Sequence, residues 1–354
     1  MTEGRARVCV PVCARRAGEL KEAVERAAVD ADIIELRLDC LDASELEAAR
    51  PALAALLEAH ERPLIFTLRP SEQGGRRDLD LSQRLSFRLD HWPTEGESNL
   101  SDFFDIELDL MPAREEDDER RRAFAAWLAR NLERVVCSHH DFKGVPPNLP
   151  EIYERMTTSP ARVLKIAYAA ETATDCLPAF ALLERARREG RELIAIAMGD
   201  AGLLTRVLAP SRGAFLTFGA SDAASATAPG QVTAADLRDL YRIDSVDEQT
   251  QLTGLVGSPV MHSLSPHVHN AAFNALGLNF VYVPLEVRDL DAFMRRMARP
   301  DTRELDWPLR GLSVTAPHKR AVIQYLDSLE PSARDIGAVN TVVLEGDRLR
   351  GHNT

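Results

Sequence analysis

Several features that define other protein classes are scarce in this chain of 354 residues. No apolar run approaches the ~20 residues of a membrane-spanning helix, so we expect no membrane partner. The five cysteines form no Cys-x-x-Cys pair, which argues against a zinc or other metal site and favours a reduced protein. Basic residues are outnumbered, and the net charge of −12 argues against a nucleic-acid partner.

Too few residues precede the first predicted strand to form a targeting segment. A strand-like run begins near Arg7, which leaves no room for a signal or transit peptide. We therefore expect a cytoplasmic protein. The length predicts two or three domains, since single cores stop growing near ~250 residues.

Short β-rich runs alternate with helical stretches from residue 7 to about residue 240. Eight strand–helix units of this length predict an α/β fold, a (β/α)8 TIM barrel, with a doubly wound open sheet as the alternative. The predicted strands are 7–14, 33–39, 63–69, 103–110, 134–140, 162–168, 192–198 and 214–219.

Charged residues share one face in three of these runs. Helices between the strands predict a parallel sheet that is covered on its outer face, so the charged face must point into the barrel. Ionised groups survive there only when they pair with one another or with a ligand. The charged residues are Glu35, Arg37 and Asp39; Asp105, Glu107 and Asp109; and Lys165.

Lys165 and His140 are the candidate catalytic residues. A buried ammonium tends to lose its proton, and the resulting amine forms a Schiff base with a carbonyl substrate. A histidine at a neighbouring strand end can then move a proton beside the imine carbon. The alternative for Lys165 is an edge-strand lysine that reaches solvent.

Further polar residues lie at or after the predicted strand ends, where barrel enzymes carry their functional groups. Arg37, Arg69 and Arg206 predict an anionic substrate, because a guanidinium pairs bidentately with carboxylate or phosphate. The other candidate binding residues are Glu35, Gln73, Thr227 and Gln231.

These residues resemble the type I 3-dehydroquinate dehydratase family over essentially all of 7–240. The matching segments are Glu35-Leu-Arg37-Leu-Asp39, Thr67-Leu-Arg69 with Gly74-Gly75, Asp105-Ile-Glu107, His140-Asp-Phe142, Lys165-Ile-Ala, Met198-Gly199 with Arg206, Thr217-Phe-Gly219 and Ala228-Pro-Gly-Gln231.

The resemblance implies a reaction that needs neither metal nor cofactor. Lys165 would form an imine with the C3 ketone of dehydroquinate, and His140 would remove a C2 proton and help to expel the C1 hydroxyl. Arg206 would hold the substrate carboxylate. Family members often carry Glu where this chain has Gln73, and Glu72 could substitute for it; Thr227 replaces a usual serine.

A second α/β unit is expected from Gln251 onward. Its motifs resemble the substrate-binding domain of shikimate dehydrogenase: Ser263-Leu-Ser265-Pro266, Ser313-Val-Thr315-Ala-Pro-His-Lys319, Gly337-Ala-Val-Asn340 and Gly351-His-Asn353. On this likeness Ser263, Ser265, Thr315 and Asn340 would bind shikimate or dehydroshikimate, and Lys319 would transfer a proton. The fused order resembles the bifunctional dehydratase–dehydrogenase enzymes of plants.

The predicted domains are residues 1–242 and 251–354, joined by a polar linker at 242–250. No Gly-x-Gly-x-x-Gly segment occurs, so we expect the Rossmann domain to be absent and NADP to bind only if a further dehydrogenase half is present. Another imine-forming lyase, a complete bifunctional enzyme in a longer chain and a non-catalytic second domain are the alternatives. A homodimer is left open.

Overall fold

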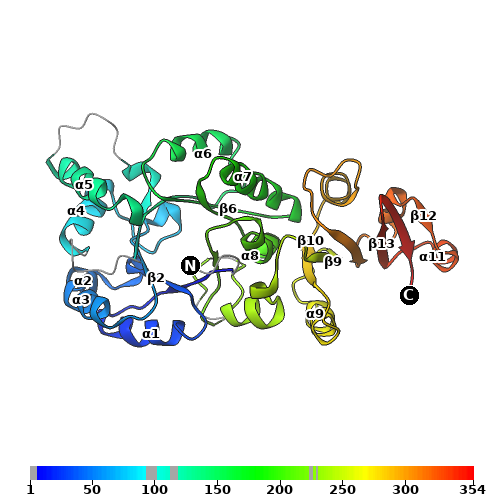
Figure 1. The fold of residues 1–354 in the computed structure, drawn as a ribbon, viewed down its shortest axis with the longest axis horizontal. Helices are drawn as coiled ribbons and strands as arrows, with labels where there is room; N and C mark the ends of the chain where they lie inside the picture. Colours follow the sequence, from blue (N-terminus) through cyan, green and yellow to red (C-terminus); the bar gives the residue numbers. More distant parts are fainter. Residues whose placement is uncertain (1–5, 93–101, 112–118, 223–225, 229) are drawn as a thin grey trace.

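Eight parallel strands form a nearly closed barrel in the computed structural model, which describes residues 6–92, 102–111, 119–222, 226–228 and 230–354 (Figure 1). The strand order is β7-β6-β5-β4-β3-β2-β1-β8, and one bridge, Leu193 to Ala214, connects β7 to the segment before β8. The strands are β1 (Val8–Val12), β2 (Ile33–Arg37), β3 (Leu64–Thr67), β4 (Phe103–Glu107), β5 (Val135–Asp141), β6 (Val163–Ala169), β7 (Glu192–Met198) and β8 (Thr217–Phe218).

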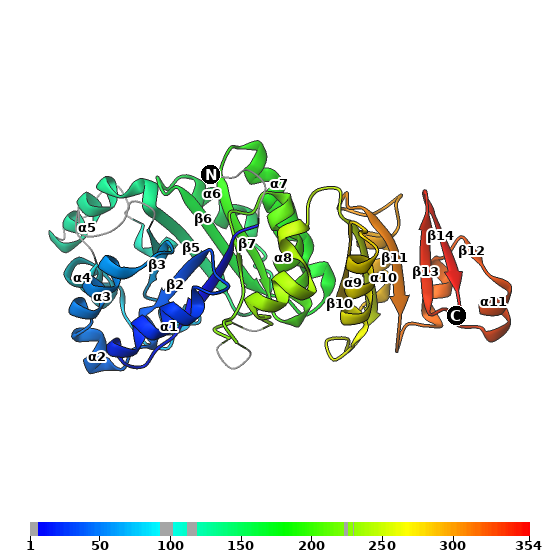
Figure 2. The ribbon, with the colours of Figure 1, turned by 60° about the horizontal axis from the view of Figure 1, so that its bottom comes forward.

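Helices surround this sheet, so the barrel prediction is confirmed and the open sheet is excluded (Figure 2). Proline stands in the first turn of α3, α6 and α7, where its missing N–H costs nothing. The helices are α1 (Leu20–Ala27), α2 (Ala43–Glu47), α3 (Arg50–Ala59), α4 (Leu81–His91), α5 (Glu119–Arg130), α6 (Leu149–Thr157), α7 (Leu177–Arg188) and α8 (Leu203–Leu208).

The alternation along each strand sorts its side chains into two layers. Outward residues such as Leu36 and Ile166 pack against the helices in the main apolar cluster. Inward residues near the strand starts, such as Ile33 and Val163, form a separate apolar cluster inside the barrel. Two residues further along, the inward face becomes polar at Glu35 on β2 and Lys165 on β6, as the alternation predicts. The apolar layer closes the barrel below this polar level.

The second unit is a six-stranded sheet in the order β10-β9-β11-β13-β14-β12. Strands β10, β9 and β11 are parallel, whereas β13 runs antiparallel to β11. A 3₁₀ segment, Ala321–Tyr325, lies between β11 and β12. The elements are β9 (Gln251–Gly257), α9 (Ser265–Ala275), β10 (Phe280–Glu286), α10 (Leu290–Phe293), β11 (Leu309–Val314), β12 (Ser328–Leu329), α11 (Pro331–Ile336), β13 (Thr341–Glu345) and β14 (Arg348–His352).

The segment 242–250, predicted as a polar linker, is packed between the two units. Ile243 is fully buried in the apolar cluster, and Arg242 donates to the carbonyl oxygen of Phe280 at 2.7 Å. Helix α8 of the barrel lies against β10, the edge strand of the second sheet (Figure 2). One apolar cluster therefore extends from the barrel helices into the second unit.

The expectation of fully reduced cysteines is wrong for one pair. Cys13 and Cys40 form a disulfide, while Cys9, Cys137 and Cys176 are free and buried. The two bonded residues follow the neighbouring parallel strands β1 and β2, and this places them at the same end of the barrel. Within the described residues, no helix combines the length and apolar character needed to cross a membrane.

Candidate functional site

One cavity at the C-terminal ends of the barrel strands is lined by all nine residues that the sequence assigned to the first domain. The space amounts to about 480 Å³, including its open mouth. Phe142, Met198, Phe218 and Ala228, which were not singled out as site residues, also line it. The predicted residues in the wall are Glu35, Arg37, Arg69, Gln73, His140, Lys165, Arg206, Thr227 and Gln231.

Lys165 lies at the floor of this cavity, with 5% of its surface exposed. Its Nζ is 3.1 Å from Oε1 of Glu35 and 3.3 Å from Oδ2 of Asp105. The same Nζ is 4.4 Å from the ring centre of Phe218. Two carboxylates and an aromatic face thus surround the amine, and the reading of Lys165 as an edge-strand lysine is wrong.

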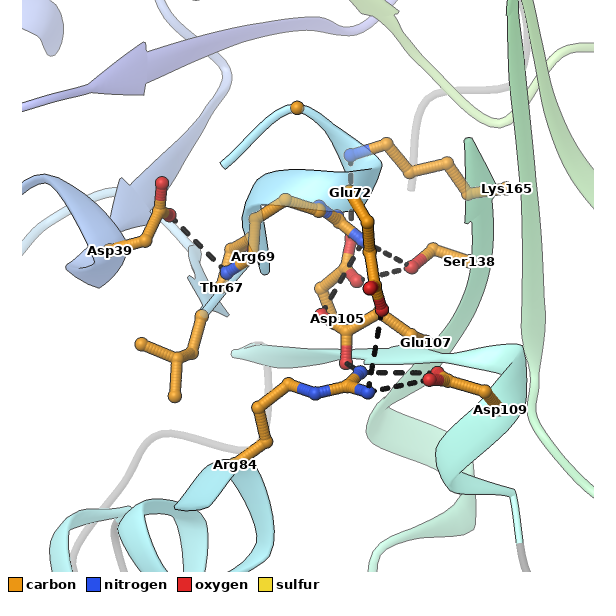
Figure 3. A network of polar contacts seen from close by, with 12 residues as sticks. Asp39, Thr67, Arg69, Glu72, Arg84, Asp105, Glu107, Asp109, Ser138 and Lys165 are labelled. Atoms are coloured by element: carbon orange, nitrogen blue, oxygen red, sulfur yellow. Dashed lines mark hydrogen bonds and ion pairs between the residues drawn. The ribbon is translucent and has the colours of Figure 1, made fainter. Parts of the chain in front are cut away.

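Asp105 is a fully buried acid beside Lys165 (Figure 3). Its carboxylate accepts from Arg69 Nη2 at 2.6 Å and from Ser138 Oγ at 2.6 Å. Burial alone would raise the pKa of Asp105, but Arg69, Lys165 and the Ser138 hydroxyl outweigh it and lower the pKa to about 2. Asp105 therefore stays ionised, as a fixed negative charge beside Lys165. The sequence placed it on the inward face but did not assign it to the site.

Arg37 and Arg69 are held in place by acids of the barrel top. Arg37 makes a bidentate pair with Asp39, at 2.9 Å for both bonds, and donates to the carbonyl oxygen of Gly74 at 3.2 Å. Asp39 also accepts from the backbone N–H of Arg69 at 3.3 Å. The Asp39 carboxylate thus connects β2 with the segment after β3, and it fixes the wall of the cavity on that side.

Arg206 reaches the cavity from α8. Only 1% of its surface is exposed, and its Nη1 donates to the carbonyl oxygen of Phe218 at 3.2 Å. Burial lowers the pKa of Arg206 to about 10, because the charged form loses its hydration. A buried guanidinium in a cavity wall provides a site for an anionic group.

His140 lies one inward position beyond Ser138 on β5. Burial lowers its pKa well below the usual range, and the nearby cations Arg69, Lys165 and Arg37 act in the same direction. The imidazole is therefore neutral near pH 7 and can accept a proton. Its Nδ1 has no hydrogen-bond partner among the described residues.

The two candidates for an acid beside His140 differ in position. Gln73 lines the cavity, and its buried Oε1 also lacks a hydrogen-bond partner in the described part of the chain. Glu72 is 68% exposed, and its carboxylate faces Arg84 at 4.0 Å (Figure 3). Glu72 therefore does not take the place of a glutamate at Gln73.

A close backbone contact positions the segment that carries Thr227 and Gln231. Gly230 has φ +63°, and a Cβ atom there would lie 2.0 Å from the carbonyl carbon of Gly199. Gln231 Oε1 accepts from the backbone N–H of Thr227 at 2.9 Å. Only glycine allows this segment to lie directly on the end of β7.

The candidate binding residues of the second domain lie together at one edge of its sheet, the edge that is formed by strand ends. Parallel strands β9 and β11 end at this edge and antiparallel β13 begins there, as the Ser313–Thr341 pairing shows. The backbone carbonyl oxygen of Asn340 accepts a hydrogen bond from the backbone N–H of Val314 at 2.7 Å. Ser263 donates to Ser265 at 3.0 Å at the start of α9. Thr315 and Lys319 follow β11 at the same edge.

Two family models match the chain. Type I 3-dehydroquinase matches residues 8–248, and the shikimate dehydrogenase substrate binding domain matches residues 255–342. The bifunctional 3-dehydroquinate dehydratase/shikimate dehydrogenase of Arabidopsis thaliana is 32% identical over 98% of this chain and 54% of its own length. The pentafunctional AROM polypeptide of Eremothecium gossypii is 32% identical over 94% of this chain and 20% of its own length.

Solved structures share the fold. The 3-dehydroquinate dehydratase of Geobacillus kaustophilus aligns with a TM-score of 0.57 and 24% identity, covering 68% of this chain and 90% of that one. The dehydroquinate dehydratase and shikimate dehydrogenase of S. pombe AroM aligns with a TM-score of 0.52 and 24% identity, covering 99% and 65%.

The chain spans about half of the length of the Arabidopsis relative and about a fifth of the length of the Eremothecium relative. The barrel, its cavity and the match over residues 8–248 agree with one another. The chain belongs to the type I 3-dehydroquinase family and carries a shikimate dehydrogenase substrate-binding domain after its barrel.

Proposed function

We propose that the barrel dehydrates 3-dehydroquinate to 3-dehydroshikimate through a Schiff base on Lys165. The single observation that carries this is the lysine amine at the floor of a cavity whose walls hold a neutral histidine and buried arginines. Family membership supports the dehydration, and the geometry of the cavity supports the lysine mechanism.

In the first step the neutral amine of Lys165 attacks the C3 ketone carbon of the substrate. Glu35, whose Oε1 is 3.1 Å from Nζ, lies where it can accept the ammonium proton. The carbonyl oxygen leaves as water, and a protonated imine forms. Asp105 remains ionised and stabilises the positive charge on the imine nitrogen.

In the second step His140 removes a proton from C2 of the substrate. The electron pair moves toward the iminium nitrogen to give an enamine. The enamine then expels the C1 hydroxyl, which takes a proton from His140 and leaves as water. Hydrolysis of the product imine frees Lys165. Protons and electrons balance without a metal or cofactor.

The arginines orient the substrate during these steps. Arg206 binds the carboxylate, because its guanidinium lies in the cavity wall and has already lost its hydration on burial. Arg37, Arg69, Thr227 and Gln231 position the ring and its hydroxyls from the remaining walls of the cavity.

Borohydride reduction tests the mechanism. Sodium borohydride added with dehydroquinate should leave a stable adduct on the peptide that contains Lys165, with loss of activity. Lys165→Met should remove both adduct and turnover. Lys143→Ala, on the exposed segment after β5, is the matched control and should retain both. Turnover of dehydroquinate without labelling of Lys165 would refute the imine mechanism, and absence of turnover in the unmodified chain would refute the dehydratase function.

For the second domain we propose binding of shikimate or dehydroshikimate at the edge that carries Ser263, Ser265, Thr315 and Asn340, with Lys319 as the proton-transfer residue. None of the described residues forms a glycine-rich pyrophosphate turn, so no described residue is assigned to NADP. Calorimetric titration with shikimate should show binding that Asn340→Ala abolishes. NADP-dependent oxidation of shikimate by this chain alone would refute the assignment.

The proposal also includes the expected domain division at 242–250 and a cytoplasmic location, and it leaves the oligomeric state open. Sedimentation of the purified chain at micromolar concentration distinguishes a monomer from a homodimer.

A further inference from the structure

Two arginines of α4, Arg84 and Arg88, reach the buried carboxylate of Glu107 at the end of β4. Figure 3 shows Arg84 beside Glu107 and Asp109. Arg88 Nη2 donates to Glu107 Oε2 at 2.7 Å and to the carbonyl oxygen of Leu68 at 3.2 Å. Arg84 Nη1 lies 3.3 Å from the same carboxylate oxygen, and its Nη2 pairs with Asp109 at 2.5 Å. The proposed reaction uses none of these groups.

Glu107 connects this pair to the site. It is fully buried, and its other oxygen, Oε1, lies 3.6 Å from Arg69 Nη1 without a hydrogen-bond partner among the described residues. Arg69 instead gives its two terminal nitrogens to Ser138 at 2.7 Å and to Asp105 at 2.6 Å. Arg69 thus lies between two buried acids, and it bonds to only one of them.

The guanidinium of Arg69 can donate to the carboxylate of Asp105 or to that of Glu107. The charge around Glu107 therefore determines which of the two accepts its hydrogen bond. Burial raises the pKa of Glu107, since Arg88, Arg69 and Arg84 compensate only part of the lost hydration. A buried carboxylate that loses one of its cations is left with an uncompensated charge, which favours a new hydrogen bond from a donor within reach. Arg84 Nη1 already lies 3.3 Å from Oε2, and the donor that faces the unbonded Oε1 is Arg69 Nη1, at 3.6 Å.

We propose that Arg88 and Arg84 are positioning residues for the lysine chemistry: by pairing with Glu107 they leave Arg69 bonded to Asp105, the fixed counter-charge beside Lys165. The proposal rests on the proposed dehydratase function and deepens it. It assigns a role in the active site to a helix on the outer face of the barrel.

Loss of Arg88 should therefore move the guanidinium of Arg69 toward Glu107 and away from Asp105 and His140. Asp105 and His140 both lie within the field of Arg69, which lowers the pKa of each. Other titratable and charged groups also lie around them: Cys9 from β1, Glu35 and Arg37 from β2, Glu107 on β4, Cys137 and His139 from β5, Lys165 from β6 and Arg88 from α4.

The test is the pH dependence of turnover in Arg88→Met. With Arg69 displaced, the pKa values of Asp105 and His140 should rise, and the acid limb of kcat should move to higher pH by about one unit. At pH 7 kcat should fall about tenfold, since the counter-charge is misplaced. Rates are normalised to the fraction of chains that borohydride traps, so that unfolded protein does not contribute.

A second variant provides the rescue. Glu107→Gln in the Arg88→Met background removes the carboxylate that competes with Asp105 for Arg69. The acid limb should then return to the wild-type position, and kcat should rise at least fivefold above that of Arg88→Met. Arg238→Met is the control for loss of a partly buried ion pair, because Arg238 binds Asp32 and Asp244 at the opposite end of the strands. It should lower thermal stability without moving the limb.

The outcomes separate this proposal from the function on which it rests. An unshifted acid limb in Arg88→Met, or a limb that Glu107→Gln does not restore, means that α4 only packs on the barrel and overturns the positioning role. Wild-type chain that neither turns over dehydroquinate nor gives a Lys165 adduct refutes the dehydratase function instead.

Discussion

Replacement of Arg206 by methionine should make the empty protein more stable while it weakens substrate binding. The guanidinium is buried in the cavity wall, and burial lowers its pKa from the ordinary value of an arginine to about 10. At about 1.4 kcal/mol for each pH unit, this difference corresponds to roughly 3 kcal/mol against the charged folded form. Because the folded-state pKa is the lower one, the cost is present at all pH values below about 10 and declines only as the pH rises through that value.

Methionine fills a similar volume without the charge. It also leaves the carbonyl oxygen of Phe218 without this donor, which costs about 1 kcal/mol and offsets part of the gain. The substrate carboxylate loses its partner at the same time, and KM should rise about 100-fold.

Urea unfolding at pH 7, followed by circular dichroism, measures the first effect, and steady-state kinetics with dehydroquinate measure the second. Arg212→Met is the matched control, because Arg212 lies outside the cavity and contacts Glu184 and Asp306; its KM should not change. If Arg206→Met unfolds at lower urea than the wild type, the guanidinium is already compensated in the empty protein and the reasoning is refuted.

Three further changes test other parts of the site. Gln73→Glu adds a carboxylate beside the cavity, so the pKa of His140 should rise and the acid limb of kcat/KM should move up by about one pH unit; an unmoved limb contradicts this. Cys13→Ser with Cys40→Ser should lower the free energy of unfolding by roughly 3 kcal/mol, and alkylation of denatured, unreduced wild type should label three cysteines rather than five. Gly230→Ala places a Cβ atom 2.0 Å from the backbone at the end of β7, so KM should rise about tenfold with Lys165 labelling retained; an unchanged KM would show that the segment can move.

The alternation of residues along the strands was sufficient to predict the barrel and its polar cavity. In a parallel sheet every strand ends at the same side, so inward-facing groups such as Glu35 on β2 and Lys165 on β6 must lie near one another. The position of the strand ends was the argument for placing Lys165 in a cavity rather than on an edge strand. The structure confirms that Lys165 lies in the cavity.

Other parts of the site depend on contacts that sequence spacing does not encode. Asp105 and Lys165 are 60 positions apart, and their contact depends on how the barrel closes. The contacts of Arg84 and Arg88 with Glu107 were not predicted, because these arginines occupy two positions of the buried face of α4 and interrupt its apolar period. The disulfide was missed because it joins the ends of neighbouring strands rather than a short motif.

The packing of α8 on β10 has a consequence for how the molecule unfolds. Because one apolar cluster continues through the barrel helices and the second sheet, melting of either unit exposes apolar surface of the other. We therefore expect one calorimetric transition rather than two, and protease resistance across residues 242–250, where separate domains are usually cleaved. We expect the second unit to unfold together with the barrel and to lose its fold when it is cut from it.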